Sequence, residues 1–540
     1  MKQRLSISLV KDFYKQDEKI LNIANCKQPK YINIIGGEGV LFIRREAEEK
    51  LPDWVYFLTE NQSEVSDTDF SKTKTSGAVL KVLILNRIFL VSFGTGFHLI
   101  NNDCIEKDFG LKVTINSVDP DKLRSIDKSN YEDNPLNTRN QSTKEVSIKG
   151  FNIDREMDLL STLTGKSNVN IFGDIVTGKD SLIINVETKV SAIKEILSEA
   201  FIRFKMKPPA AFEWIDNVKR VNDSDVSDIL DLEIDNYLID FNLCKDFWLG
   251  EPEIVDWSKQ SGYCFESRSN EYQTTLSLKS LYSLYKAKGI STNVNEFKSH
   301  YIYVIDDNEK AYKKWPVYDC LYAEVSYDNN CYILRAGEWF KVNVDFINRV
   351  DGFLSSVKPY ERVLPIYNHD REGFYNSYVH NLGVGFVSLD QSNIQQGGKH
   401  DKVEFCDLIN QKELIHVKFY RSSSTLSHLF SQGFVSAESF LSNKVFREKL
   451  LKILPDNLKS INPSFRPNAY EFTVVFAIAT KKELPKELPF FSKLTLKNII
   501  KSLEMYGFNV RMSKIETDEN LLRKKLGKKG KETKRKTANC

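Results

Sequence analysis

The sequence predicts a multi-domain α+β protein that ends in an α/β domain. Its 540 residues correspond to about three domains of ordinary size. The composition, with 41% hydrophobic, 12% aromatic and 28% charged residues, is typical of globular chains and excludes collagens, coiled coils and low-complexity proteins. Strand patterns dominate the first part, strands and helices mix in the middle, and the last part combines the two in a regular order.

The first domain is expected at residues 1–128 and consists of strands with few helices. Apolar or alternating runs predict strands at residues 4–11, 31–35, 40–45, 54–60, 78–85, 87–93 and 111–118. Residues 129–150 are polar, contain many Asn, Ser and Thr, and show neither the helical nor the strand period. We therefore expect a linker at residues 129–150.

A middle α+β domain is expected at residues 151–350. Hydrophobic periodicity predicts helices at residues 188–205 and 276–289 and strands at residues 299–306, 320–328 and 331–337. The last two strands are separated by Asp328, Asn329 and Asn330, residue types that tolerate the left-handed backbone of a tight turn. We expect these two strands to form a hairpin.

Several classes of protein and site are excluded by simple patterns. No apolar run approaches the roughly 18 residues of a membrane-spanning helix, and the N-terminal sequence lacks the apolar core of a signal peptide. The eight cysteines are scattered, without the CxxC spacing of a zinc or redox site. Residues 173–180 nearly match a phosphate-binding loop, but Asp180 stands at the hydroxyl position and a strand pattern follows. We expect a cytoplasmic protein with reduced thiols.

A basic tail is expected at residues 516–540. Residues 523–536 hold nine Lys or Arg and one Glu, a net charge of +8 that leaves −5 on the rest of the +3 chain. Such a run cannot bury itself and is expected to be disordered. Two interpretations stay open, a solvated tail that aids solubility or an arm that binds phosphate groups of any sequence. The phosphate-binding residues of such an arm would include Lys528, Lys529, Lys534 and Arg535.

The chemistry is expected in the last domain, at residues 351–515. Five of the seven histidines lie in one segment of this domain, together with six acidic residues and a lysine that we single out: His369, His380, His400, His416, His428, Asp370, Glu372, Asp390, Asp401, Glu404, Asp407 and Lys418. The predicted elements are a helix at residues 371–382, strands at 384–389, 403–409 and 413–420, a helix at 424–434 and a later strand at 471–479. This order is helix, three strands, helix, strand.

The second and third of these strands are expected to form a hairpin. If residues 410–411 are its two-residue loop, Asp407 lies opposite Leu414. Because side chains alternate with period two, Asp407 then shares a face of the sheet with His416 and Lys418. A loop of odd length would place them on opposite faces.

Glu372, Asp407 and Lys418 together form a set of known chemistry. Glu372 lies one turn before the apolar face of the predicted helix and can point toward the sheet. Two carboxylates bind a hard cation such as Mg²⁺ or Mn²⁺, which lowers the pKa of a bound water and stabilises charge on a phosphodiester. His416 is a further candidate ligand of the metal. Lys418 would orient the attacking water or offset the charge of the transition state.

The helix that follows begins with Arg421, Ser422, Ser423 and Ser424. Their hydroxyls and the free N–H groups of a helix N-terminus suit a phosphate group. The alternative interpretation is a helix cap with no ligand.

At these residues the pattern resembles the restriction-endonuclease-like PD-(D/E)xK nuclease superfamily. The resemblance implies that Asp407 takes the place of the Asp of the motif, Lys418 that of its Lys, and Glu372 that of the acid on the first helix. His416 stands where the motif has Glu or Asp, and a neutral imidazole suits softer ions than magnesium. The resemblance implies either a site that favours manganese or a similar ion, or one that has lost metal-dependent cleavage.

A second resemblance spans nearly the whole chain. The segments VSFGTGFHLI, DFGLKVTINSVDPDKLRSID, KDFWLGEPEIVDW and HVKFYRSSSTLSHLFSQG are similar to a sporadically distributed bacterial family of unknown function. Members of that family have about this length and occur in mobile and defence-type gene neighbourhoods. This context agrees with a nuclease directed against foreign DNA or RNA but implies no activity by itself.

The function expected from the sequence is metal-dependent hydrolysis of nucleic-acid phosphodiesters, with no contact to membranes. One alternative is a nucleic-acid-binding or sensing protein that keeps the nuclease fold without cleavage. Another is an interaction scaffold whose N-terminal domains bind a protein partner or a second copy of the chain. Each site residue also has a structural interpretation. Asp407 would then be a strand-end residue, His416 a half-buried histidine and Lys418 an exposed strand lysine.

Overall fold

The computed structural model describes most of residues 2–518. The segments outside the description are residues 1, 36, 46–50, 52–54, 56–57, 60–63, 65, 73, 131–135, 242, 245, 254, 256–259, 267–271, 307–309, 391, 396–401, 455, 457–458, 460 and 519–540. The fold is mixed α+β with several sheets, as expected. The chain forms two compact units, one of Met1–Asn130 and Leu136–Ile215 and one of Tyr131–Pro135 and Asp216–Cys540. Each unit is described by itself.

The first unit is built on one ten-stranded antiparallel sheet in the order β2-β3-β4-β5-β1-β10-β9-β8-β6-β7. Its strands are β1 (Lys2–Leu9), β2 (Lys30–Ile34), β3 (Gly37–Ile43), β4 (Gly77–Ile84), β5 (Arg87–Gly94), β6 (Val118–Asn130), β7 (Asn137–Val146), β8 (Asp158–Ser167), β9 (Ile175–Gly178) and β10 (Leu182–Glu187). The helices are α1 (Asp17–Ile20), α3 (Phe109–Ile115) and α4 (Ile193–Lys205). The near match to a phosphate-binding loop forms the β9–β10 hairpin.

Helix α3 replaces the strand expected at residues 111–118. It buries Phe109, Leu111 and Val113 in the core of the first unit, and its backbone lies directly against the β9–β10 hairpin. A Cβ on Gly110 would meet the backbone oxygen of Ser181 at 2.0 Å, so this approach requires glycine. Packing of the apolar face has overridden the β-branched pattern of this segment. Of the strand expected at residues 54–60, the described residues are helical.

The expected linker at residues 129–150 contains a strand instead. Strand β7 occupies Asn137–Val146 and pairs only with β6, at the end of the sheet. No side chain of β7 is buried, so the sequence has no apolar alternation to reveal it. Side chains fix this edge, since Arg139 donates two hydrogen bonds to the carboxylate of Asp127, at 2.7 and 2.8 Å.

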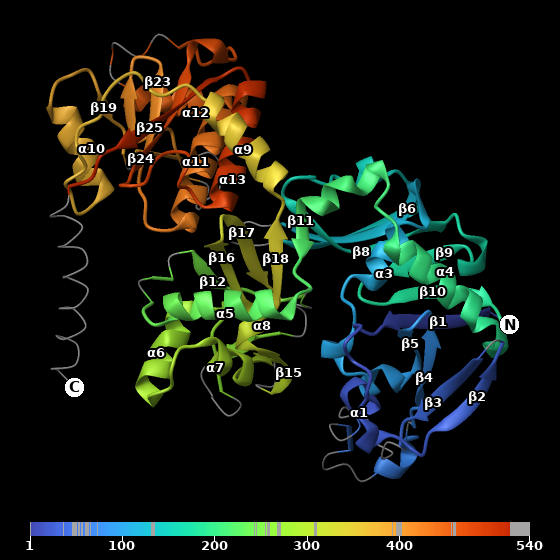
Figure 1. Ribbon diagram of the computed structural model, residues 1–540. Helices are drawn as coiled ribbons and strands as arrows, with labels where there is room; N and C mark the ends of the chain where they lie inside the picture. Colours follow the sequence, from blue (N-terminus) through green and yellow to red (C-terminus); the bar gives the residue numbers. More distant parts are fainter. Residues whose placement is uncertain are drawn as a thin grey trace. The chain divides into compact units, whose positions relative to one another are not determined.

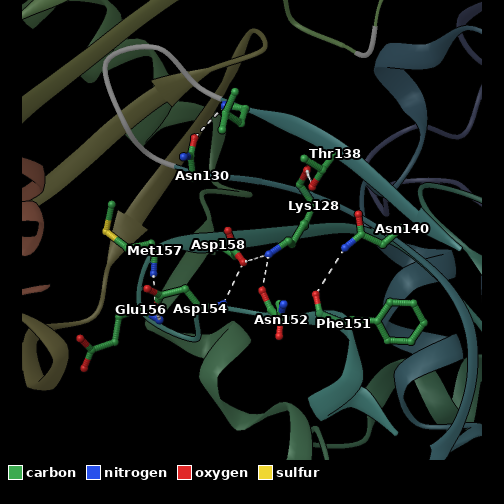
Figure 2. A network of polar contacts seen from close by, with 11 residues as sticks. Lys128, Asn130, Thr138, Asn140, Phe151, Asn152, Asp154, Glu156, Met157 and Asp158 are labelled. Atoms are coloured by element: carbon green, nitrogen blue, oxygen red, sulfur yellow. Dashed lines mark hydrogen bonds and ion pairs between the residues drawn. The ribbon is translucent and has the colours of Figure 1, made fainter. Parts of the chain in front are cut away.

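A second polar network joins β6 to the segment before β8 (Figure 2). The ammonium group of Lys128 contacts the carboxylate of Asp158 and the backbone oxygen of Asn152, at 2.5 and 2.6 Å. The same carboxylate accepts the N–H of Asp154 at 2.9 Å. Residues 136–158 therefore belong to the first unit, which continues to Ile215 rather than ending at residue 128.

The second unit begins with the remainder of the expected middle domain. A five-stranded sheet in the order β11-β18-β17-β16-β12 lies beside a three-stranded sheet of β13, β14 and β15. The elements are β11 (Val218–Arg220), α5 (Ser224–Leu238), β12 (Phe247–Leu249), β13 (Gly262–Cys264), α6 (Leu278–Lys288), α7 (Val294–Ser299), β14 (Tyr301–Ile305), β15 (Ala311–Pro316), α8 (Val317–Cys320), β16 (Leu321–Tyr327), β17 (Asn330–Arg335) and β18 (Glu338–Val342). The expected hairpin turn is confirmed, because Asp328 and Asn329 have φ of 48° and 56°.

The last part of the second unit contains a five-stranded sheet in the order β19-β22-β23-β24-β25. Its elements are α9 (Val344–Ser356), α10 (Glu372–Asn381), β19 (Val387–Ser388), β20 (Asn393–Gln395), β21 (Lys402–Glu404), β22 (Leu408–Asn410), β23 (Glu413–Phe419), α11 (Ser423–Ser442), α12 (Lys444–Ile453), β24 (Thr473–Ala479), α13 (Phe490–Met505) and β25 (Asn509–Ile515). Strands β23, β24 and β25 are parallel, whereas β19, β22 and β23 pair antiparallel.

Helices cover both faces of this sheet, with α10 on one side and α11 and α13 on the other (Figure 1). The odd-numbered residues of β23, such as Ile415 and Val417, share a hydrophobic core with Tyr375 of α10. The even-numbered residue His416 faces α11, because a Cβ on Gly433 would lie 3.4 Å from its ring. The two faces of β23 therefore belong to two separate cores.

The sheet of β16 and β17 is joined to the last sheet through the start of α13. The carboxylate of Glu324, on β16, accepts the backbone N–H groups of Phe490 and Phe491. Lys493 forms an ion pair of 2.8 Å with Asp351 of α9. Burial raises the pKa of Glu324 to about 7.

Within the described residues, no helix is long and apolar enough to cross a membrane. The seven cysteines of the described part are buried, and none of them forms a disulfide within that part.

Candidate functional site

The β22–β23 hairpin has a two-residue loop, one position later than expected. Asn410 pairs with Glu413, so the loop is residues 411–412 rather than 410–411. Lys412, in this loop, forms an ion pair with Glu471, which precedes β24. Pairing ends at Leu408, so the regular alternation that would place Asp407 opposite a single residue does not extend to it.

Beyond that point the edge of β23 toward β22 is covered by side chains instead of a strand. The N–H of Val417 donates to Oδ2 of Asp407 at 2.7 Å, and the N–H of Phe419 donates to Oε1 of Glu372 at 3.2 Å. Two carboxylates thus occupy positions that backbone oxygens would take in a longer β22. Because the two N–H groups are two residues apart on one strand, the carboxylates lie about 7 Å apart along it.

Lys418 lies between these two anchored positions. Its Nζ is 2.8 Å from Oε2 of Glu372, so one carboxylate holds both the ammonium group and the neighbouring backbone. Glu372 is the first residue of α10, where the helix dipole favours an acid. Burial raises the pKa of Asp407, and the positive charge of Lys418 opposes this rise, which shows that the two groups are within electrostatic reach of each other. The structure therefore brings Glu372, Asp407 and Lys418 together as the sequence predicts.

Two further acids converge on Asp407. Carboxylate oxygens of Asp390, Glu404 and Asp407 lie within 4.8 Å of one another, an arrangement that could hold a metal ion. Asp390 follows β19 and Glu404 ends β21, so three neighbouring segments each supply one acid. Gln432 of α11 donates a hydrogen bond of 2.9 Å to Glu404.

The electrostatics of Asp407 suit a bound cation. Burial raises its pKa well above the ordinary value, and the neighbouring charges of Glu404 and Asp390 raise it further. The Val417 N–H and the charge of Lys418 act in the opposite direction. Three carboxylates that repel one another form an oxygen donor set for a hard divalent cation such as Mg²⁺ or Mn²⁺, which would relieve that repulsion. The residues therefore fit the metal that the sequence predicts, although the acids that converge differ in part from the expected ones.

Asp390 and Glu404 were not expected to act with Asp407. Both belong to the acidic region that the sequence singles out, but a continuous strand at residues 403–409 would place Glu404 and Asp407 three residues apart on opposite faces. The strand is in fact broken at residues 405–407, between β21 and β22, and the break folds the two acids toward each other. The signal available in the sequence was only the density of acids.

His416 differs from its expected place among metal ligands. Its ring is fully buried and lies 6.2 Å, centroid to centroid, from the ring of Phe476. Within the described residues neither ring nitrogen has a hydrogen-bond partner, and His416 is not part of the acidic group. Burial lowers its pKa to about 4, so the imidazole is neutral near pH 7. Its side chain belongs to the core beneath α11.

The start of α11 lies directly after Lys418. Ser422 is the N-terminal cap of this helix and forms a capping box with Thr425, whose Oγ1 accepts the N–H of Ser422 at 3.2 Å. Arg421 is exposed. The side chains of Ser423 and Ser424, and the tail residues Lys528, Lys529, Lys534 and Arg535, lie outside the described part of the chain.

Comparison with known proteins identifies a family but no activity. The sequence matches the family of unknown function DUF6119 over residues 4–516. Because this match covers nearly the whole chain, the protein belongs to that family, as the second resemblance predicts. No curated protein and no solved structure matches it.

Proposed function

We propose that the last part of this member of the DUF6119 family, residues 351–515, is a metal-dependent nuclease of the restriction-endonuclease-like type. One observation carries the proposal: the open edge of β23 holds the carboxylates of Asp407 and Glu372 about 7 Å apart, with Lys418 between them. Such a cluster at a strand end serves no need of the core, because Glu372 and Lys418 are only half-buried.

The metal would be held by Asp407, Asp390 and Glu404, whose oxygens converge within 4.8 Å. A divalent cation bound there would lower the pKa of a coordinated water and stabilise charge on a phosphodiester. Asp407 has a second contact, to the N–H of Val417, which fixes its carboxylate in place. The metal set of the proposal is therefore Asp407 with Asp390, which follows β19, and Glu404, which ends β21, in place of Glu372 and His416.

Glu372 acts on Lys418 in this proposal. Its carboxylate fixes the ammonium group at 2.8 Å and the strand backbone at 3.2 Å, so that the ammonium group cannot fold away along the sheet. A fixed cation beside the scissile phosphate would orient the attacking water and offset the negative charge that develops in the transition state. Arg421 and the N-terminus of α11, directly after β23, are placed to bind the flanking phosphate.

The decisive experiment is cleavage of DNA and RNA substrates in the presence of Mg²⁺ or Mn²⁺. We expect cleavage by the full chain and its loss in Asp407→Asn and Lys418→Met, which keep the size of each side chain. The matched control is Lys412→Met, an exposed lysine of the same hairpin that lies about 20 Å from Lys418 along β23. This control should cleave normally. Normal cleavage by the Asp407 and Lys418 variants would refute the proposed site.

Binding measurements distinguish the alternatives. Salt-dependent binding of nucleic acid with no cleavage under any metal would favour a binding or sensing protein with a degenerate nuclease fold. Deletion of residues 523–540 should flatten the dependence of affinity on salt, because fewer counterions are released from the phosphates. No binding at all would leave a protein-interaction scaffold.

A further inference from the structure

Helix α5 has apolar residues on two faces, and among the described residues only one of these faces is buried. Leu230, Ile234 and Leu238 are fully buried in the core of the sheets around β16. The opposite face is apolar but exposed: Ile229 is 38% exposed, Leu232 66%, Ile239 76% and Leu243, in the turn after the helix, 52%. At 100° per residue Ile229, Leu232 and Ile239, the residue that caps the helix, fall within one sector of roughly 80°, centred opposite the buried face. Asn236 is exposed in the same sector, and Leu243 follows in the turn. We call the four apolar residues the α5 stripe.

Acidic residues border the α5 stripe on both sides. Residues 222–240 contain seven Asp or Glu and no Lys or Arg. Asp231 is committed to the core, where it accepts hydrogen bonds from Tyr318 and Trp339, but Asp225, Asp228 and Asp240 are exposed. Helical geometry places Asp228 on one flank of the stripe and Glu233 on the other, and Asp240 follows just beyond the end of the helix. An apolar ridge between two rows of carboxylates is the complement of a segment that combines apolar and basic side chains.

The chain itself contains such a segment. The 22 residues after Asp518 include Leu521, Leu522 and Leu526, and the net charge of residues 523–536 is +8. The described chain ends in the same compact unit as α5, with the N–H of Asp518 bonded to the backbone oxygen of Tyr367 at 3.1 Å. Fully extended, 22 residues span up to about 70 Å, so the length of the tail does not prevent it from reaching another part of this unit.

We propose that the leucines of residues 519–526 dock on the α5 stripe and that the following Lys and Arg residues pair with its acidic flanks. The two surfaces match in both properties, since the tail has the charge that α5 lacks and α5 offers the exposed apolar area that three leucines would cover. The docking itself does not depend on cleavage by the proposed nuclease site.

The docking has a consequence for nucleic-acid binding. Lys and Arg residues that pair with the carboxylates of α5 are not available to phosphate groups, so α5 and nucleic acid compete for the tail. A competing intramolecular contact reduces the apparent affinity for the external ligand by the fraction of free tail. The tail would then be an arm that α5 restrains and that a high concentration of nucleic acid releases.

Proximity between the tail and α5 is tested by cross-linking in the full-length chain. The chain has eight cysteines, and the seven in the described part are buried. Replacing the eighth, Cys540, by Ser therefore leaves only these buried thiols. Lys525→Cys and Asp228→Cys are then added, and a short bis-maleimide is applied. The matched control combines Lys525→Cys with Asp456→Cys, an acid whose side chain is 97% exposed elsewhere in the same unit.

We expect a cross-linked monomer with Asp228→Cys and little with Asp456→Cys. Adding Leu232→Ser and Ile239→Ser should abolish the product, and because both residues are exposed these changes should leave the fold intact. Equal cross-linking to both positions, or no product, would overturn the proposal. A product only at the mass of two chains would show that the occupant is a second copy and would overturn the intramolecular contact.

A second readout measures the competition with a fluorescent single-stranded oligonucleotide. The Leu232→Ser, Ile239→Ser double variant should bind the probe more tightly than the wild type, and this gain should vanish when residues 519–540 are deleted. The control is Val445→Ser with Met505→Ser, two exposed apolar residues on α12 and α13. Unchanged affinity in the double variant of α5 would refute the competition. Absence of nucleic-acid binding would refute the proposed function but leave the cross-link as an independent test of docking.

Discussion

His416 should make the stability of the sheet around β23 dependent on pH in a predictable direction. Its pKa falls from 6.5 to about 4 because the folded protein buries the imidazole without a hydrogen bond. Between about pH 6.5 and about pH 4, His416 is therefore mostly protonated in the unfolded chain and mostly neutral in the folded chain. The stabilisation is complete above the unfolded pKa and is lost as the pH falls through this window. At 1.36 kcal/mol per pKa unit, the full loss is about 3 kcal/mol, of which about 2 kcal/mol falls between about pH 7 and about pH 5.

The perturbation is His416→Leu, which keeps a similar volume and removes the titrating group. All six tryptophans precede residue 340, so their fluorescence does not report on this sheet. Hydrogen exchange of the β23 and β24 amides, compared between variant and wild type at each pH, measures the local stability directly. The wild type should lose about 2 kcal/mol more than the variant between about pH 7 and about pH 5.

A matched histidine variant controls for general effects of acid. His428 is exposed on α11, so His428→Gln should follow the wild type at every pH. Parallel pH profiles for wild type and His416→Leu would refute the buried neutral imidazole. The His416→Leu variant should still bind Mn²⁺, because His416 is not part of the group of Asp390, Glu404 and Asp407. Loss of Mn²⁺ binding in this variant would indicate that His416 is a metal ligand.

Three further predictions concern other contacts of the second unit. Because burial and neighbouring acids raise the pKa of Asp407, protons compete with the metal for its carboxylate, and the affinity for Mn²⁺ measured by calorimetry should increase as pH rises. An affinity independent of pH would contradict this. Gly433→Ala should destabilise the protein by about 1 to 3 kcal/mol in thermal unfolding, because the new Cβ would lie 2.6 Å from the ring of Phe476. An unchanged stability would show that the side chains around Phe476 can rearrange without cost. Burial raises the pKa of Glu324 to about 7, so its contribution to stability should be lost as pH rises through 7. Glu324→Gln should flatten this pH dependence when it is measured by hydrogen exchange of the α13 amides. Identical pH profiles for variant and wild type would exclude a titrating carboxylate.

The elements with strong hydrophobic periods lie close to their predicted positions. The helix expected at residues 371–382 is α10, the strand at 413–420 is β23, and the strand at 471–479 is β24. Each of these segments buries one face or both faces, so its apolar residues recur with the period of a helix or a strand and can be recognised in the sequence. Strand β7 shows the reverse case, because none of its side chains is buried and nine of its ten residues are polar, a pattern that predicts a linker.

Helix α3 was mistaken for a strand for a different reason. Residues 111–116 alternate like a strand, but residues 109–115 pack as a short helix whose Gly110 lies against the β9–β10 hairpin. That contact joins residues about seventy positions apart, so no local pattern reports it.

For the candidate site, the sequence by itself determined which residue types gather near β23. It placed Glu372 at the start of a helix, Asp407 at a strand end and Lys418 on the neighbouring strand, and all three lie along one open edge. Only the tertiary structure decided how they are used. The early end of β22 turns two carboxylates onto backbone N–H groups, and the break before it brings Asp390 and Glu404 to Asp407 while His416 stays in the core. Local periodicity fixes the face of a side chain, whereas the point at which a strand loses its partner depends on chain segments that are distant in sequence.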